Sequence, residues 1–197
     1  MKESKIENSA PLTVIRQIGQ KRDDVEDCYF RKCVYGDTLT IVNIQSKVIE
    51  ELANAHSQNL FIPTKPDEIE RLLQREQDAI YFICVQTPDG ICAYSCTIFD
   101  EKCDASLSPH FESKRVATFD SVVVLPDFRG NALQSKLLKI SEEKAKEEGY
   151  DIIASMVSPK NTHSMDNFIK EGFKVFDTIT YGEQKLDRCI VFKNLIH

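Results

Sequence analysis

The sequence predicts an α/β protein of the α+β type, built on a central sheet that is mixed but mostly antiparallel. Short runs rich in β-branched and aromatic residues recur along the chain, as expected for strands. Turn sequences such as Pro88, Asp89 and Gly90 separate some neighbouring runs, which favours antiparallel hairpins. Two buried runs are instead joined by a long amphipathic segment, which predicts a parallel strand pair connected by a helix.

Composition excludes several classes of protein. The 197 residues suit one domain with a substantial core, and the net charge of −6 without a long basic run argues against nucleic-acid binding. The absence of a long apolar stretch and the polar start MKESKIENS predict no membrane association and a cytoplasmic location. The seven cysteines form no CxxC pair, so we expect neither a disulfide framework nor a metal site.

The first 40 or so residues carry the weakest structural signals. Residues 12–18 predict a short strand, and a charged stretch follows it. Residues 29–35 and 39–42 flank Gly36 and Asp37, which predicts a hairpin.

Helical periodicity begins at Gln45 and returns after Pro66, which predicts two helices separated by the link 59–63. Residues 79–86 and 91–99 predict the strands of a hairpin. A long polar connection, 100–114, follows, and connections of that length are often functional. The remaining predicted elements are a strand at 122–125, a helix at 131–148, a strand at 151–157, a helix at 161–171, and strands at 173–181 and 187–192.

The stretch 118–138 (TFDSVVVLPDFRGNALQSKLL) carries the clearest functional signal. Pro126 ends its buried strand, because proline has no N–H to offer a central ladder. Arg129, Gly130 and Asn131 then turn the chain into a helix. A strand that leads through a tight turn to a helix N-terminus presents free backbone N–H groups and a positive dipole end, so this place is suited to binding phosphate.

This turn resembles the acyl-CoA-binding motif of the GCN5-related N-acetyltransferase (GNAT) family, which has an Arg/Gln-x-x-Gly-x-Gly/Ala pattern there. Arg129 matches the first position. Ala132 and Gln134 depart from the pattern, because they stand where the family prefers glycine and a small residue.

A second match lies downstream, at the family's usual distance. Asn161, Ser164 and Phe168, followed by Gly172 and Phe173, resemble the family's fourth-helix signature. The resemblance implies a GNAT fold, with one splayed parallel strand pair and about four flanking helices.

The implied activity is transfer of an acetyl group from acetyl-CoA to a primary amine by direct attack in a ternary complex. The match assigns residues 39–197 to the GNAT acyltransferase domain and leaves 1–38 as an N-terminal extension. The alternative is a regulatory module that binds acyl-CoA but is catalytically weak or inactive.

The resemblance also implies where the cofactor binds. Its pantetheine arm would enter the gap between the splayed strands, and its diphosphate would lie on the turn. The residues implied as cofactor contacts are Val122, Val123, Val124, Arg129, Gly130, Asn131, Ala132, Leu133, Gln134, Ser135, Asn161, Ser164 and Phe168.

Catalytic roles follow from the same resemblance. Asp120 stands where many members have a catalytic glutamate, so it is the candidate base, with a structural or capping aspartate as the alternative. The backbone N–H of Val124 would stabilise the oxyanion. Phe168 stands where the family often has a proton-donating tyrosine, so Ser164, Tyr181, His110 or solvent would protonate the departing thiolate.

The acceptor is expected to be a small-molecule or peptide amine. By resemblance, Leu60, Phe61 and Ile62 would form one wall of its site, although the same residues could simply cover the core. His110, in the connection 100–114, is a further candidate contact. Homodimers are common in the family, so a homodimer is possible here.

Overall fold

A computed structural model gives the structure of residues 11–74, 80–99, 107–112 and 114–195. None of the helices in these ranges is both long and apolar enough to cross a membrane. The elements, in chain order, are β1 (Leu12–Ile18), β2 (Lys21–Lys32), η1 (Tyr35–Asp37), α1 (Thr38–Asn54), η2 (Gln58–Leu60), α2 (Pro66–Gln74), β3 (Ile80–Thr87), β4 (Gly90–Ile98), η3 (Ser108–His110), β5 (Val116–Val124), η4 (Pro126–Phe128), α3 (Leu133–Glu147), β6 (Ile152–Val157), α4 (Thr162–Lys170), β7 (Lys174–Tyr181) and β8 (Leu186–Asn194).

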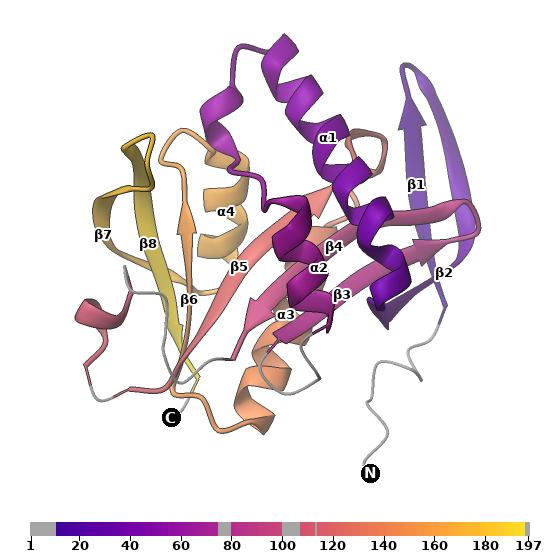
Figure 1. Cartoon of the computed structure of the whole chain (residues 1–197). Helices are drawn as coiled ribbons and strands as arrows, with labels where there is room; N and C mark the ends of the chain where they lie inside the picture. The colour runs from indigo at the N-terminus through magenta and orange to yellow at the C-terminus, as the bar shows by residue number, and fades with distance from the viewer. Residues whose placement is uncertain (1–10, 75–79, 100–106, 113, 196–197) are drawn as a thin grey trace.

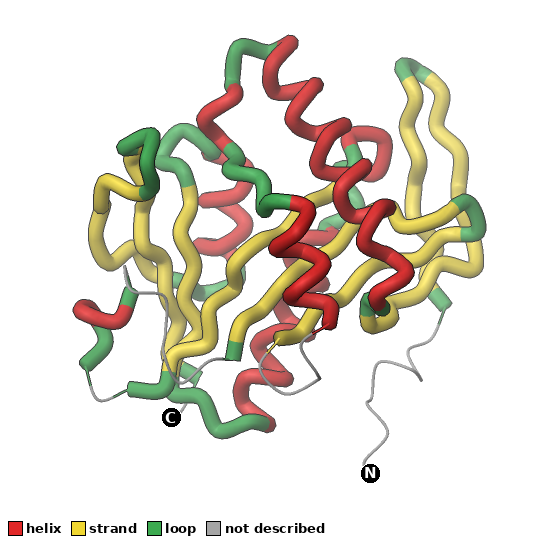
Figure 2. The backbone as a smooth tube through the Cα atoms, viewed as in Figure 1, coloured by secondary structure: helices red, strands yellow, loops and turns green. Residues whose placement is uncertain are grey.

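The strands form one eight-stranded sheet in the order β1-β2-β3-β4-β5-β6-β8-β7. Every neighbouring pair is antiparallel except β5 and β6, which are parallel. The helices α1 and α2 lie on one face of the sheet, and α3 and α4 lie on the other (Figure 1). Figure 2 shows the strands as a single twisted layer between them. The predicted α+β fold, with a mostly antiparallel mixed sheet, is confirmed.

Apolar cores on both faces of the sheet stabilise this three-layer arrangement. Ile41, Ile44 and Val48 of α1 pack with Ile69 of α2 against one face of the sheet. On the opposite face the core contains leucines of α3 together with Phe168 of α4. Each helix buries one apolar stripe against the sheet, which explains why both faces are covered.

The parallel pair separates along its length. Pairing between β5 and β6 runs from Val116 opposite Ile152 to Thr118 opposite Ala154 and then stops. Both strands continue past this point, β5 to Val124 and β6 to Val157. A gap therefore opens between their C-terminal ends, which is the splay expected from the sequence.

The predicted hairpin over residues 29–35 and 39–42 is wrong. Residues 21–32, including the charged stretch, form β2, which pairs with β1 on one side and β3 on the other. Residues 38–54 are α1, whose buried face packs onto the sheet. Tertiary packing of that amphipathic face outweighs the strand preference of the β-branched residues at its start.

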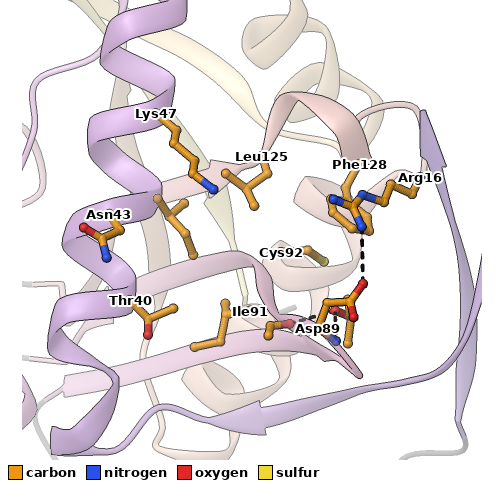
Figure 3. A pocket seen from close by; sticks show the side chains of 12 residues that line it. Arg16, Thr40, Asn43, Lys47, Asp89, Ile91, Cys92, Leu125 and Phe128 are labelled. Atoms are coloured by element: carbon orange, nitrogen blue, oxygen red, sulfur yellow. Dashed lines mark hydrogen bonds and ion pairs between the residues drawn. The ribbon is translucent and has the colours of Figure 1, made fainter. Parts of the chain in front are cut away.

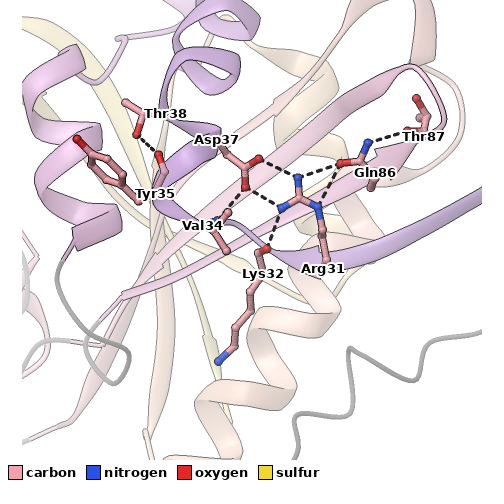
Figure 4. Close-up of polar contacts among 8 residues, drawn as sticks. All are labelled: Arg31, Lys32, Val34, Tyr35, Asp37, Thr38, Gln86 and Thr87. Atoms are coloured by element: carbon pink, nitrogen blue, oxygen red, sulfur yellow. Dashed lines mark hydrogen bonds and ion pairs between the residues drawn. The ribbon is translucent and has the colours of Figure 1, made fainter.

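A polar cluster ties the start of α1 to the sheet (Figure 4). The Arg31 guanidinium donates hydrogen bonds of 2.7 and 2.8 Å to the two carboxylate oxygens of Asp37, and of 2.9 and 3.1 Å to Gln86 Oε1. Asp37 also accepts the Val34 N–H at 2.8 Å. Burial alone would raise the pKa of Asp37, but the hydrogen bonds from Arg31 and Val34 and the charge of Arg31 outweigh it and lower that pKa.

Candidate active site

The gap between β5 and β6 exposes backbone groups of β5. The Leu125 N–H donates to the Cys92 carbonyl of β4 at 2.9 Å, so it points away from the gap. Because N–H directions alternate along a strand, the N–H groups of Val124 and Val122 point toward β6 and the gap, whereas that of Val123 points toward β4. An extended ligand in the gap could therefore pair with Val122 and Val124 as a strand would.

The turn after β5 presents a second set of free donors. Gly130 and Ala132 have φ values of +83° and +53°, which fold the chain tightly back into α3. The first hydrogen bond of α3 runs from the Lys136 N–H to the Ala132 carbonyl at 3.0 Å. The N–H groups of Leu133, Gln134 and Ser135 consequently have no helical acceptor. We call residues 129–135 the cradle.

Two cradle side chains point away from this donor set and hold the loop in place. The Arg129 guanidinium makes hydrogen bonds of 2.7 and 2.6 Å to the carboxylate of Glu51 on α1. The Asn131 side chain accepts the Ile15 N–H at 2.8 Å and donates to the Ile15 carbonyl at 2.7 Å, so it pairs with β1 much as a strand would. Both side chains thus tie the cradle to neighbouring elements.

The cradle is also bridged to α4. Gln134 Nε2 donates to Ser164 Oγ at 3.0 Å, and Gln134 Oε1 accepts from Asn167 Nδ2 at 2.9 Å. The side chain of Asn161 caps α4 by accepting the Ser164 N–H at 3.2 Å. Thus the structure brings Gln134, Ser164 and Asn161 together beside the gap, with Ser164 already engaged by Gln134.

Phe168 lies in the apolar core, with 2% of its surface exposed. Its ring contacts those of Phe119 and Phe173 edge to face, with centroids 6.1 and 5.1 Å apart. An apolar ring at this position completes the packing of α4 on the sheet and has no proton to donate.

Asp120 occupies a β-bulge on β5. Cys96 pairs with Ser121 and Thr97 pairs with Phe119, so Asp120 is the extra residue between them. Bulges re-aim side chains, and Asp120 is exposed to solvent. Burial raises the pKa of Cys96 and of Tyr94, and the charge of Asp120 raises each further, so its carboxylate lies near both groups.

Each end of the link between α1 and α2 is held by a buried side chain. Leu60 and Phe61 are half-buried, and Ile62 is 43% exposed. Gln45, buried on α1, holds the end of the link: its side-chain amide accepts the Thr64 N–H at 2.9 Å and donates to the Thr64 carbonyl at 3.2 Å. The start of the link is held by Arg188 of β8, whose Nη2 donates to the Asn59 carbonyl at 3.0 Å.

The two remaining candidates lie apart from each other. Tyr181 ends β7, and its charge state influences the pKa of Arg188, so it lies at the end of the sheet that meets the link. His110 belongs to η3, and its ring contacts Phe176 of β7 at 5.4 Å. Figure 1 places η3 at the other end of the sheet from η2. Most of the connection 100–114 lies outside the described residues, so its predicted overhang of the acceptor site stays a prediction.

A separate cavity of about 260 Å³ lies between α1, β1, the β3–β4 turn and η4 (Figure 3). The Arg16 guanidinium lies beside it, 3.2 Å from Asp89 and 5.7 Å from the centre of the Phe128 ring. None of the site residues predicted from the sequence is among its described lining.

The arrangement fits an extended ligand with a diphosphate. The cradle offers three backbone donors at a helix N-terminus, where a negative charge is stabilised. The gap offers two further donors in line with them. Among the described residues, no group of three His, Cys, Asp or Glu side chains is placed to hold a metal ion.

Gln45 and Arg188 carry no functional signal in the sequence. Each belongs to a strand or helix whose pattern predicted only packing. Their roles depend on contacts with distant segments, as between Arg188 and Asn59, for which the sequence carries no local signal.

Comparison with known proteins identifies the family of the chain. Residues 47–173 match the sequence model of the Acetyltransferase (GNAT) family. An uncharacterized N-acetyltransferase of Methanocaldococcus jannaschii is 28% identical over 105 residues, which are 52% of this chain and 42% of that protein. The chain thus spans less than half the length of this relative.

Solved structures share the fold at low sequence identity. An acetyltransferase of the GNAT family from Streptococcus pneumoniae matches with a TM-score of 0.65 and 18% identity, over 85% of this chain and 98% of that one. A protein from Salmonella typhimurium, described as an acetyltransferase with its cofactor acetyl-CoA, matches with a TM-score of 0.62 and 17% identity, over 86% and 95% of the two chains.

Proposed function

Because the chain belongs to the acetyltransferase (GNAT) family, as its motifs predicted, we propose that it transfers an acetyl group from acetyl-CoA to a primary amine. In this proposal both substrates bind together and the amine attacks directly. The observation that carries it is the cradle: Leu133, Gln134 and Ser135 offer N–H groups without helical acceptors, directly beyond a gap in the sheet.

Acetyl-CoA would supply an acetyl group activated as a thioester. Its diphosphate fits the cradle, where the backbone N–H groups and the dipole of α3 oppose its charge. Its pantetheine arm fits the gap, where Val122 can pair with it. Asn161 and Ser164, at the start of α4, border the same path.

Asp120 is the proposed base. It accepts a proton from the ammonium group of the acceptor, through a water if the carboxylate does not reach it. The freed amine forms the new C–N bond, the C–S bond breaks, and the sulfur takes a proton. The Val124 N–H, which points into the gap, would stabilise the negative charge on the carbonyl oxygen during this step.

The proton for the sulfur needs a donor other than Phe168, which lies in the core. Ser164 is one protein candidate, because its hydroxyl accepts from Gln134 and keeps its own proton to donate. Tyr181 lies on the far side of the gap, beyond β6. Solvent is the third source.

Calorimetric titration with acetyl-CoA and with CoA tests the binding step. We expect micromolar affinity for both, and the absence of binding would overturn the proposal. Thiol release measured with a panel of amines then tests transfer. Binding without transfer to any amine would favour a regulatory acyl-CoA-binding module, the second candidate function, which the core position of Phe168 favours.

Asp120→Asn tests the base. The variant should lower kcat at neutral pH by about 10²- to 10⁴-fold, because a positioned base contributes that much, and it should leave the Kd for CoA unchanged. Asp166→Asn, at an exposed aspartate on α4, is the control and should behave as the wild type. A normal rate for Asp120→Asn would leave Asp120 with a structural role only.

A further inference from the structure

Arg188 is a buried cation beside the proposed acceptor site. Only 5% of its surface is exposed. Its guanidinium donates to two backbone carbonyls, from Nη1 to Asp187 at 2.8 Å and from Nη2 to Asn59 at 3.0 Å. A guanidinium has five N–H donors, and these two bonds use two of them.

The positive charge of Arg188 lies outside the ion pairs that the described residues form. In the part of the chain that the structure describes, seven ion pairs are found and none includes Arg188. Burial lowers its pKa, and the influence of Asp187 and Tyr181 offsets this only in part. Buried charges are usually paired, because taking an ion out of water is costly. An unpaired one next to a substrate site is a place where a ligand can supply the partner.

The sheet register places Arg188 at the end of the gap. The last residue pair between β6 and β8 is Val157 with Cys189, so Arg188 lies just past the end of β6. Ile190, two residues along the same strand, belongs to the core on the face opposite α3 and α4. Arg188 therefore faces the side of the sheet that carries α1, α2 and their link, in agreement with its bond to Asn59.

Asp120 faces the same side. Its carboxylate lies near Tyr94 and Cys96, which pack under α1 and α2. The strand β6 separates β5 from β8, and β5 no longer pairs with β6 at the level of Asp120. Asp120 and Arg188 are therefore more than about 10 Å apart across the sheet and about 7 Å apart along it. One small molecule can reach an acidic group at one position and a basic group at the other.

We propose that the acceptor is a small amine that also carries an anionic group, as an amino acid does, and that Arg188 binds that group. This inference rests on the proposed acetyl transfer, whose amine would meet Asp120. A carboxylate on the acceptor would complete the hydrogen bonding of the guanidinium, and Arg is well suited to bind both of its oxygens at once. Arg188 is thus assigned as a specificity-determining residue.

Matched acceptors test the proposal with the wild-type protein. Each amino acid in a panel is compared with its carboxamide and with its decarboxylated amine, for example ornithine with putrescine. We expect kcat/KM for the best amino acid to exceed that of both analogues by about 100-fold, since a polar site that loses its partner discriminates strongly. Equal rates, or faster transfer to the amines without a carboxylate, would overturn the proposal while leaving acetyl transfer intact.

Variants connect the preference to Arg188. In Arg188→Met, kcat/KM for the amino acid should fall about 100-fold more than kcat/KM for the carboxamide, which loses only the support that Arg188 gives to the link. Arg188→Lys should keep part of the advantage of the amino acid. Arg22→Met, at an exposed arginine of β2, is the control. An equal loss on acid and carboxamide would make Arg188 a tether for the link and overturn its assigned role.

The Kd for CoA, measured in the same variants, distinguishes a defect in cofactor binding from a defect in acceptor recognition. Unchanged CoA binding in Arg188→Met shows that the variant is folded and that any lost transfer concerns the acceptor. If Arg188→Met does not fold, the Arg188→Lys variant and the wild-type comparison decide the question. Failure of the wild type to bind CoA would contradict the proposed function itself.

Discussion

A charge placed at Ser135 should have opposite effects on stability and on cofactor binding. Ser135 is the third residue of α3, and its N–H has no helical acceptor. A glutamate in the first turn of a helix interacts favourably with the dipole, so Ser135→Glu should raise the free energy of unfolding by about 0.3–1 kcal/mol.

The same carboxylate would meet the diphosphate of CoA. Two like charges about 5 Å apart at a solvated surface repel by roughly 1–2 kcal/mol, and the second phosphate adds to this. A total of about 2 kcal/mol corresponds to a roughly 30-fold higher Kd. Surface charges are screened by salt, so the effect should shrink at high ionic strength.

Calorimetric titration with CoA and urea unfolding measure the two quantities on the same samples. Ser135→Gln is the matched control, because it has the size of glutamate without the charge. We expect the glutamine variant to bind nearly as the wild type does and the glutamate variant to bind about 30-fold more weakly. Equal affinity of the two variants would refute the assignment of residues 133–135 as the diphosphate site.

Two further predictions concern stability. Ala132 has a φ of +53°, which costs an L-residue roughly 1–2 kcal/mol. Glycine removes this strain but has more freedom in the unfolded chain, so Ala132→Gly should raise the free energy of unfolding in urea by about 0.5–1 kcal/mol. A less stable variant would contradict this account of the turn. The pKa of Asp37 is lower in the folded protein than its ordinary value of 3.8, so the ion pair with Arg31 stabilises the fold above pH 3.8. This stabilisation is lost as the pH falls through the pKa that Asp37 has in the folded protein. Asp37→Asn should therefore be less stable than the wild type by about 2 kcal/mol at pH 7, with the difference shrinking below pH 4, and a difference that does not change with pH would be inconsistent with the pair.

Local signals in the sequence were enough to predict the strand, turn and helix start that form the cradle. The β-branched run 122–125, the proline that follows it and the glycine at 130 predicted a strand, a turn and a helix start, and the structure has all three. These features follow from residue shape and backbone freedom within a few positions, so they need no information from the rest of the chain. The motif match at this turn also led to the family.

Local sequence signals did not predict the secondary structure of two segments, because contacts with other elements determine it. The charged residues 21–27 show no clear strand pattern, yet they lie in β2, where pairing with β1 satisfies the backbone. Residues 39–42 have strand-like composition, yet they begin α1, because a helix there buries Ile41 and Ile44 against the sheet. The partner of residues 21–27 is the neighbouring strand β1, whereas the sheet residues that cover Ile41 and Ile44 belong to β3 and β4, far along the sequence.

The sequence by itself determined the fold class, the position of the cradle and the family, because these depend on short-range patterns. Only the tertiary structure placed the Asn131 side chain against β1, Gln134 against α4 and Arg188 against the link between α1 and α2. Arg188 and Asn59 are 129 residues apart, and no local pattern near either residue predicts their contact. The proposed acceptor side of the site therefore depends on the folded sheet, because the residues assigned to it meet only when distant strands and helices pack together.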